Sequence, residues 1–348
     1  MATKDGIVCM TGVTGFLGFR TLRYALDAGY SVLAAVRSEA KAELVRSNSA
    51  LKFKDGQLNF IVVPDMSLPG AFDEAFRGVK YIVHVASPIS TKADDADTDL
   101  EKSFVTAAID MTRELFKSAS KAGTVKRIVI TSSAGAIVPM SAFFEPTNTP
   151  YSAELRQPEL PGPYDNAMGA YIASKIAALN RAEEWVKEHK PTFDVIQIHP
   201  SFILGRDDMC KTKDAFNTGT NRLVLNHALG VTDSQMPVRP PTFNSVQDCA
   251  MVHVKALDPS VAGNQSFIVS SAGGDGFEWN QANEIISETF PEAVKNGTLP
   301  NNGFTATLPC LLDVAKTEQT FKFKHAPFEP LVVEVVGHYL EVLEAEKT

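Results

Sequence analysis

Short apolar runs rich in β-branched residues recur through the first part of the chain, and each has the length of a strand. Helix-like segments lie between most of these runs. Leu17–Ala28 ends at Gly29 and Glu101–Ala122 ends at Gly123, and glycine accepts the left-handed conformation that commonly closes a helix. The predicted strands are Ile7–Met10, Ser31–Val36, Asn59–Val63, Lys80–Val85, Arg127–Ile130 and Phe193–Ile198.

Strand and helix alternate along this part of the chain, which predicts a parallel sheet. The strand runs lack a period-two alternation of apolar and polar residues, as do strands that helices cover on both faces. We therefore expect an α/β fold with a doubly wound parallel sheet. The alternation weakens after Pro200, and segment 139–163, which carries six prolines, is predicted to be a long loop of the kind that often covers a site.

Composition narrows the classes of function. A hydrophobic fraction of 44% and a charged fraction of 21% over 348 residues fit a compact globular protein. The net charge of −8 leaves no basic stripe for a nucleic acid partner. The four cysteines lack ligand spacing, and the acidic residues within 94–99 lack the glycine and glutamate of a calcium loop, so we predict no metal site.

The cysteine pattern and the N-terminus favour a reducing compartment. The first residues contain no hydrophobic stretch of the kind that a signal peptide needs. No run approaches the roughly 20 apolar residues of a membrane span. We therefore expect a cytoplasmic protein without a membrane partner.

A glycine-rich turn, TGVTGFLG at residues 11–18, joins the first predicted strand to the first predicted helix. A dinucleotide-binding motif requires this context, although three glycines can also serve only to make a turn. Gly12 would permit the sharp turn, Gly15 would let the backbone approach a pyrophosphate, and Gly18 would let helix pack against strand. The helix N-terminus adds N–H groups and the positive end of its dipole. The expected cofactor-binding residues here are Gly12, Thr14, Gly15, Phe16, Leu17 and Gly18.

The end of the second strand indicates which dinucleotide binds. NAD-binding domains commonly carry an acidic residue there for the ribose hydroxyls, whereas this chain has Arg37. A guanidinium can bind the 2′-phosphate of NADP through two charge-assisted hydrogen bonds. Lys41 either reinforces this contact or is a solvated lysine on a helix face. We expect NADP (NADPH) as the cofactor.

A tyrosine and a lysine suited to proton transfer lie one helical turn apart, at Tyr171 and Lys175. The pKa of a free tyrosine, near 10, falls when a nearby positive charge favours the phenolate, and Lys175 is placed to supply that charge. Ser133 follows a predicted strand that precedes Tyr171 in the chain. We expect Ser133 to hydrogen-bond a substrate carbonyl while Tyr171 donates the proton. Lys175 is also expected to bind the nicotinamide ribose. Whether Ser132 shares the role of Ser133 stays open.

The motifs TGVTGFLG, HVASP, TSSAG and YIASK together resemble the extended short-chain dehydrogenase/reductase family over most of the chain, within its dihydroflavonol reductase-like branch of fungal and yeast ketone, aldehyde and methylglyoxal reductases. The resemblance implies a Rossmann domain. It implies that Asp65 and Met66 lie beside adenine, and Ala86 near the pyrophosphate or ribose. It also implies that Pro200 and Ser201 lie near the nicotinamide.

Two departures from the family pattern concern the active site. Val138 stands where the plant flavonoid reductases carry an asparagine, which argues against a flavonoid substrate. Asp110-Met111 replaces the Asn-Gly of many relatives, which leaves the local hydrogen bonding open. His84, His199, Asp248 and His253 are expected to be structural residues.

The distribution of predicted strands and helices along the chain predicts its domain organisation. We expect residues 1–199 to form the NADP-binding domain, with return segments at about 241–270, where a helical pattern precedes a strand-like run. Residues 200–240 and 271–348 are expected to form a smaller, irregular substrate-binding domain.

The expected function is NADPH-dependent reduction of a ketone or aldehyde to an alcohol. Two alternatives are a nucleotide-sugar epimerase or dehydratase and a non-catalytic NADP-sensing protein. Epimerases often place a carboxylate beside the serine, where this chain has Ala134-Gly135. Phenylalanines near the predicted lid favour an apolar or aromatic pocket for a small carbonyl substrate. The pattern specifies neither that substrate nor the number of subunits. These phenylalanines are Phe143, Phe144, Phe202 and Phe216.

Overall fold

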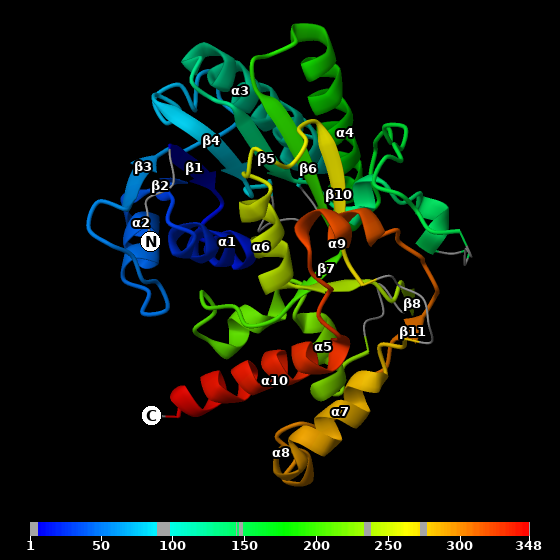
Figure 1. Ribbon diagram of the computed structural model, residues 1–348. Coiled ribbons are helices and arrows are strands. Elements are labelled where there is room, and N and C mark those ends of the chain that lie inside the picture. Colours follow the sequence, from blue (N-terminus) through cyan, green and yellow to red (C-terminus); the bar gives the residue numbers. More distant parts are fainter. Residues whose placement is uncertain are drawn as a thin grey trace. The chain divides into compact units, whose positions relative to one another are not determined.

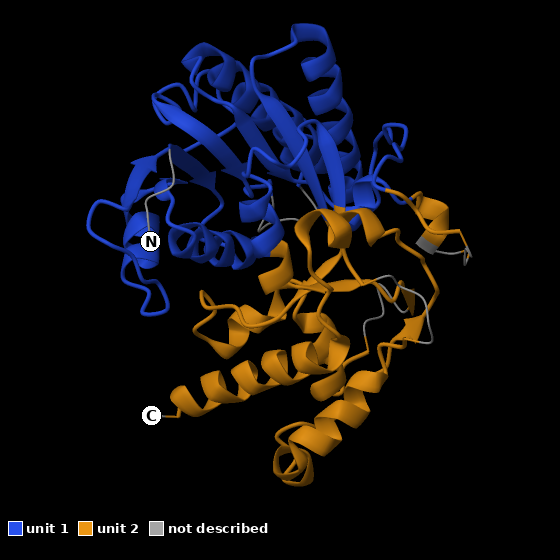
Figure 2. Ribbon diagram, viewed as in Figure 1, with its two compact units in different colours: residues 1–138, 153–199, 250–267 blue, residues 139–152, 200–249, 268–348 orange. Residues whose placement is uncertain are grey.

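A computed structural model describes most of the chain (Figure 1). The described residues are 6–88, 98–143, 145, 149–232, 238–271 and 277–347. They belong to two compact units (Figure 2). Unit 1 comprises residues 1–138, 153–199 and 250–267, and unit 2 comprises residues 139–152, 200–249 and 268–348. No helix in the described ranges is both long enough and apolar enough to cross a bilayer.

The central sheet lies largely in unit 1, and its described strands have the order β10-β6-β5-β4-β1-β2-β3. β1 pairs in parallel with both β2 and β4, so the strand order reverses direction between β1 and β4. Ligands of doubly wound sheets bind outside the carboxyl ends of the strands at such a reversal. The expected α/β fold with a doubly wound parallel sheet is confirmed. The strands are β1 (Ile7–Thr11), β2 (Ser31–Val36), β3 (Leu58–Val62), β4 (Val79–His84), β5 (Arg127–Thr131), β6 (Asp194–Pro200) and β10 (Gln265–Val269).

The helices beside this sheet begin and end close to the expected residues. The second of the two predicted helices starts as a π-helical segment at Glu101–Thr106, continues as α3 and ends at Gly123, whose φ is 68°. α3 packs against α4 and contributes Leu115 and Phe116 to the buried core of unit 1. The helices are α1 (Phe16–Asp27), α2 (Glu39–Arg46), α3 (Ala107–Ala122), α4 (Ala167–His189) and α6 (Val246–Lys255).

A buried arginine joins β5 to two later segments of unit 1. Arg127 donates from Nε and Nη2 to the two carboxylate oxygens of Asp194, at 2.6 and 2.9 Å. Its Nη1 donates to the carbonyls of Ala256 and Asp258, and Nη2 also donates to that of Val261. These bonds use every N–H that a guanidinium offers, so the buried charge is fully hydrogen-bonded.

Unit 2 is more helical than the sequence pattern indicated, and its core is aromatic. Trp279 is fully buried and donates from Nε1 to the carbonyl of Pro240 at 3.0 Å. Its ring packs edge-on against Phe243, Phe277 and Phe328. The elements are η3 (Met140–Phe143), β7 (Phe202–Leu204), η4 (Lys213–Asn217), α5 (Arg222–Ala228), β8 (Val238–Arg239), β9 (Phe243–Ser245), α7 (Gln281–Thr289), α8 (Pro291–Lys295), β11 (Ala306–Thr307), α9 (Ala315–Phe321) and α10 (Phe328–Ala345).

Candidate active site

The glycine turn occupies the point where the strand order reverses. Gly12 directly follows β1 with a φ of 77°, and a Cβ there would lie 2.6 Å from the backbone nitrogen of Ala86, which follows β4. A Cβ on Gly18 would lie 2.0 Å from the carbonyl oxygen of Gly12. Both positions therefore require glycine, one for the turn and one for the approach of α1 to it.

Gly15 differs from these two glycines, because nothing in the fold requires it. A Cβ there would meet only the Gly12 carbonyl oxygen, at an ordinary 3.5 Å. Gly15 is exposed and is the N-cap of α1, where no side chain caps the helix and the first turn holds no acidic residue. The free N–H groups and the open space above them fit a phosphate group, so this cradle is suited to a dinucleotide.

Thr11, the last residue of β1, links the glycine turn to the end of β4. The hydroxyl of Thr11 accepts from the backbone N–H of Ala86 at 3.2 Å and lies 2.9 Å from Nδ1 of His84. Burial, with the nearby charge of Lys175, lowers the pKa of His84 to about 3, so this imidazole is neutral. Thr11 thus fixes Ala86 beside Gly12, a function that no sequence pattern had indicated.

The two basic residues expected at the adenosine phosphate are exposed. Arg37 follows the last residue of β2, and it makes no hydrogen bond or ion pair with the described part of the chain. Lys41 lies in the first turn of α2, where its backbone N–H donates to the N-cap hydroxyl of Ser38 at 3.3 Å. Both side chains are therefore available to an anionic ligand.

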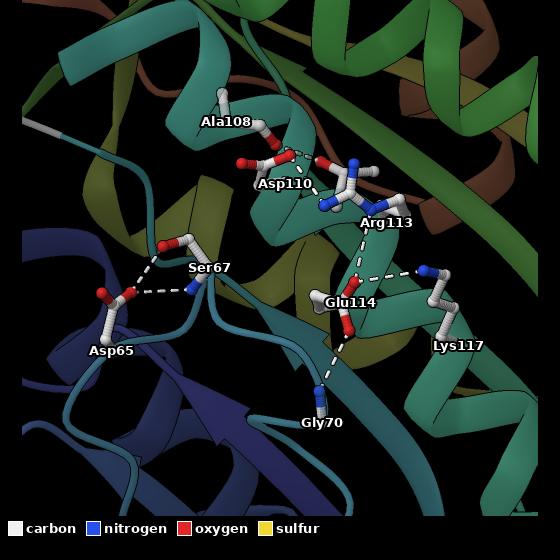
Figure 3. Close-up of polar contacts among 9 residues, drawn as sticks. Asp65, Ser67, Gly70, Ala108, Asp110, Arg113, Glu114 and Lys117 are labelled. Carbon is white, nitrogen blue, oxygen red and sulfur yellow. Dashed lines mark hydrogen bonds and ion pairs between the residues drawn. The ribbon is translucent and has the colours of Figure 1, made fainter. Parts of the chain in front are cut away.

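The loop after β3 carries Asp65 and Met66. The carboxylate of Asp65 accepts from the backbone N–H and the hydroxyl of Ser67, at 2.9 and 2.6 Å (Figure 3). These hydrogen bonds lower the pKa of Asp65. Met66 is buried in the core of unit 1. Asp65 therefore presents a fixed, ionised carboxylate, whereas the side chain of Met66 serves packing.

A buried glutamate holds the same loop from α3. Glu114 accepts from the Gly70 N–H at 3.0 Å and also pairs with Arg113 and Lys117 (Figure 3). Burial raises the pKa of Glu114, but these hydrogen bonds outweigh it and leave the pKa below its ordinary value. Asp110, whose hydrogen bonding the sequence left open, pairs with Arg113 at 2.9 Å. Asp110 therefore belongs to this ion-pair group.

The three expected catalytic residues lie together in unit 1. The hydroxyl groups of Ser133 and Tyr171 are hydrogen-bonded. Nζ of Lys175 lies 5.8 Å from the centre of the Tyr171 ring and donates to the carbonyl of Thr131 at 3.1 Å. The Thr131 hydroxyl in turn lies 2.8 Å from Nε2 of His253. β5, α4 and α6 thus meet at this group.

Burial changes the acidity of the two titratable members in opposite directions. The expectation that Lys175 lowers the pKa of Tyr171 is wrong: burial raises that pKa, and the hydrogen bond with Ser133 offsets only part of the rise. Burial lowers the pKa of Lys175 to about 8. At neutral pH the tyrosine therefore holds its proton while the lysine is mostly charged.

Ser132 points to a different environment from Ser133. Ser132 and Met111 line a cavity of about 30 Å³ next to Lys175, between α3, α4 and the sheet. The Ser132 hydroxyl is buried and has no hydrogen-bond partner in the described structure. Successive side chains of an extended chain point to opposite sides, which accounts for the difference between the two serines.

Pro200 and Ser201, expected near the nicotinamide, begin a segment of unit 2. Pro200 is buried, and the hydroxyl of Ser201 accepts from Ser270 at 2.7 Å and from the amide of Asn244 at 3.4 Å. Asp248 of this unit, expected to be structural, accepts from the Ala326 N–H at 2.9 Å.

Unit 2 contains a hollow of about 470 Å³. Phe216, one of the phenylalanines expected near a lid, lines it together with Tyr339, Leu225, Lys213 and Arg222. Phe202 packs against the Trp279 core. Phe144, like most of the acidic segment 94–99, lies outside the described residues.

The reversed strand order and the glycine turn define a Rossmann-type dinucleotide-binding fold. The sequence pattern of the NAD dependent epimerase/dehydratase family matches residues 8–269, and the chain belongs to this family. Its similarity to the fungal and yeast reductase branch is also confirmed.

Three relatives illustrate that similarity. Ketoreductase CTB6 of Cercospora nicotianae is 43% identical over 99% of this chain and 97% of its own length. The NAD-dependent epimerase/dehydratase ALT6 of Alternaria alternata is 33% identical over 84% of this chain and 85% of its own. The crystal structure of yeast methylglyoxal/isovaleraldehyde reductase Gre2 complexed with NADPH matches 97% of this chain and 99% of its own chain. The TM-score is 0.79 and the sequence identity is 24%, so this similarity shows the shared fold.

Proposed function

We propose that this chain is an NADPH-dependent oxidoreductase that reduces a ketone or aldehyde to an alcohol, with Tyr171 as the proton donor. The hydrogen bond between Ser133 and Tyr171, with Lys175 one turn further along α4, carries the proposal. The names of its relatives, a ketoreductase among them, support the same reaction.

When bound, NADPH would supply the hydride that reduces the carbonyl carbon. The hydroxyl of Ser133 donates a hydrogen bond to the carbonyl oxygen and orients it toward Tyr171. As negative charge develops on that oxygen, Tyr171 donates its phenolic proton, which its raised pKa has kept in place at neutral pH. The ammonium of Lys175 stabilises the phenolate that remains until solvent returns a proton.

The cofactor fits the residues of unit 1. The cradle at Gly12, Gly15 and Gly18 would hold the pyrophosphate, and the exposed side chains of Arg37 and Lys41 would bind the 2′-phosphate. We assign Asp65 to the adenosine. We also assign Thr14, Phe16, Leu17, Met66 and Ala86 to the cofactor contacts of this unit, and Pro200 and Ser201 to the nicotinamide.

A small apolar or aromatic carbonyl compound is the proposed substrate. The aromatic residues of unit 2, among them the packed rings of Phe216 and Tyr339, support this class. The four cysteines are free and buried, which supports a reducing, cytoplasmic location.

The test follows absorbance at 340 nm with NADPH or NADH and a panel of aldehydes, α-ketoesters, aryl ketones and diketones. We expect NADPH oxidation that falls about 10²–10⁴-fold in Tyr171→Phe, because that variant lacks the proton donor but keeps the ring. Tyr164→Phe is the matched control on the same unit. Tight NADPH binding without turnover would favour a sensor or an epimerase-type reaction instead, and a preference for NADH would contradict the assignment of Arg37.

A further inference from the structure

A histidine on the strand next to the catalytic serine makes a side-chain contact that the proposed reaction does not use. His199 lies near the end of β6 and is fully buried. Its Nδ1 lies 3.2 Å from the carbonyl oxygen of Ser133. Because a carbonyl oxygen only accepts hydrogen bonds, Nδ1 must carry the proton and donate it. Nε2 is then unprotonated and can only accept a hydrogen bond, and it has no hydrogen-bond partner in the described structure.

The contact lies where the ladder between β5 and β6 ends. The last main-chain bond near this point runs from the Ser132 N–H to the Ile198 carbonyl at 2.7 Å. Beyond it the backbone turns into the short helix η2 (Ala134–Ala136). At Ser133 the side chain of His199 therefore replaces a strand-to-strand hydrogen bond.

The Ser133 peptide group is held on several sides. Its carbonyl oxygen accepts from the Ala136 N–H at 3.0 Å as well as from His199, and its hydroxyl accepts from the Gly135 N–H at 3.1 Å. The two contacts from η2 move together with the turn itself. The bond from His199, in contrast, joins the Ser133 carbonyl to the neighbouring strand β6.

His199 acts as a hydrogen-bond donor and not as an acid. Burial, the first cause, and the charges of Arg156 and Lys175 lower its pKa to about 3. The imidazole is therefore neutral across the working range of an enzyme, and its Nδ1 proton stays on the ring.

We propose that His199 is a positioning residue, which fixes the Ser133 peptide through Nδ1 and thereby holds the Ser133 hydroxyl in register with Tyr171. The inference rests on the proposed roles of Ser133 and Tyr171. An error of about 1 Å in the placement of a reacting group costs about 10²-fold in rate, so the loss of this bond acts mainly on kcat.

Asparagine and glutamine substitutions at His199 distinguish the role of Nδ1 from that of Nε2. The amide nitrogen of His199→Asn can occupy the place of Nδ1 and donate to Ser133, whereas that of His199→Gln falls near Nε2 and cannot. We expect His199→Asn to keep kcat within about threefold, and His199→Gln and His199→Leu to lower it roughly 10–100-fold. The KM and the fluorescence-measured Kd for NADPH should change less than about threefold, because the cradle at Gly12 lies on other strands.

Three outcomes would decide the matter. Equal kcat in His199→Asn and His199→Gln, with Tyr171→Phe inactive, would overturn the inference and leave the proposed function standing. No turnover in the wild type, or full activity in Tyr171→Phe, would overturn the proposed function and this inference with it. If the variants fail to fold, ¹⁵N spectra of the histidine-labelled wild type decide, because a proton on Nε2 of His199 would contradict the donor role.

Discussion

Two alanine substitutions in the glycine turn should act on different properties, Gly18→Ala mainly on stability and Gly15→Ala mainly on cofactor binding. A Cβ on Gly18 would lie 2.0 Å from the Gly12 carbonyl oxygen, about 1 Å inside the 3.0 Å limit that real Cβ contacts respect. Gly18→Ala must therefore displace α1 from β1, and overpacking of this kind costs about 1–3 kcal/mol. We expect the Tm to fall by roughly 2–4 °C for each kcal/mol lost.

Gly15→Ala is the matched variant, because its Cβ would lie at an ordinary 3.5 Å from the same oxygen. Its Tm should fall less than that of Gly18→Ala, because only the preference of an N-cap for glycine over alanine is lost, while the new methyl group fills the space above the N-terminus of α1. We expect the Kd for NADPH to rise at least about tenfold. Calorimetry and a fluorescence titration measure the two quantities. Wild-type NADPH affinity in Gly15→Ala would refute the cradle, and an unchanged Tm in Gly18→Ala would refute the contact geometry.

Three further predictions concern charge. Arg37→Glu should raise the Kd for NADPH about 100-fold and leave the Kd for NADH nearly unchanged, because only NADPH carries the 2′-phosphate. An equal loss of affinity for both cofactors would contradict the assignment of Arg37 to that phosphate. Lys175→Met should abolish turnover yet raise the free energy of unfolding at pH 7 by about 1–3 kcal/mol, because the folded pKa of about 8 lies below the ordinary 10.5. That gain should fade as pH rises from 8 toward 10.5, and denaturant titrations at several pH values test it. Glu114→Gln should cost stability at neutral pH, and the difference from wild type should shrink as pH falls below 4.5, because the lowered pKa makes the ionised glutamate stabilising only above that range.

The strands of the sheet were predictable because each is a compact apolar run between helices. Ser31–Val36 forms β2 with the predicted bounds. α10 could not be predicted in the same way, because the valines around Val332 and Val335 favour strand and only the core of unit 2 makes them helical.

The candidate site shows the same division between local and long-range information. The glycine turn and the pair Tyr171 and Lys175 are local patterns, so their grouping could be expected from spacing. The contact of His199 with Ser133 depends on how β5 and β6 align beyond the end of their ladder. Thr11 and Glu114 likewise gain their partners only through long-range packing.

The order in which the ribosome delivers the chain matters for this fold. Unit 1 includes residues 250–267, which are synthesised after the first long stretch of unit 2. Until they emerge, β6 is an edge strand without β10, and Arg127 lacks the carbonyls of Ala256, Asp258 and Val261. While the residues between β6 and β10 are synthesised, the nascent protein therefore carries an open sheet edge and an arginine that lacks three carbonyl partners, and an unpaired edge strand of this kind exposes a folding chain to aggregation.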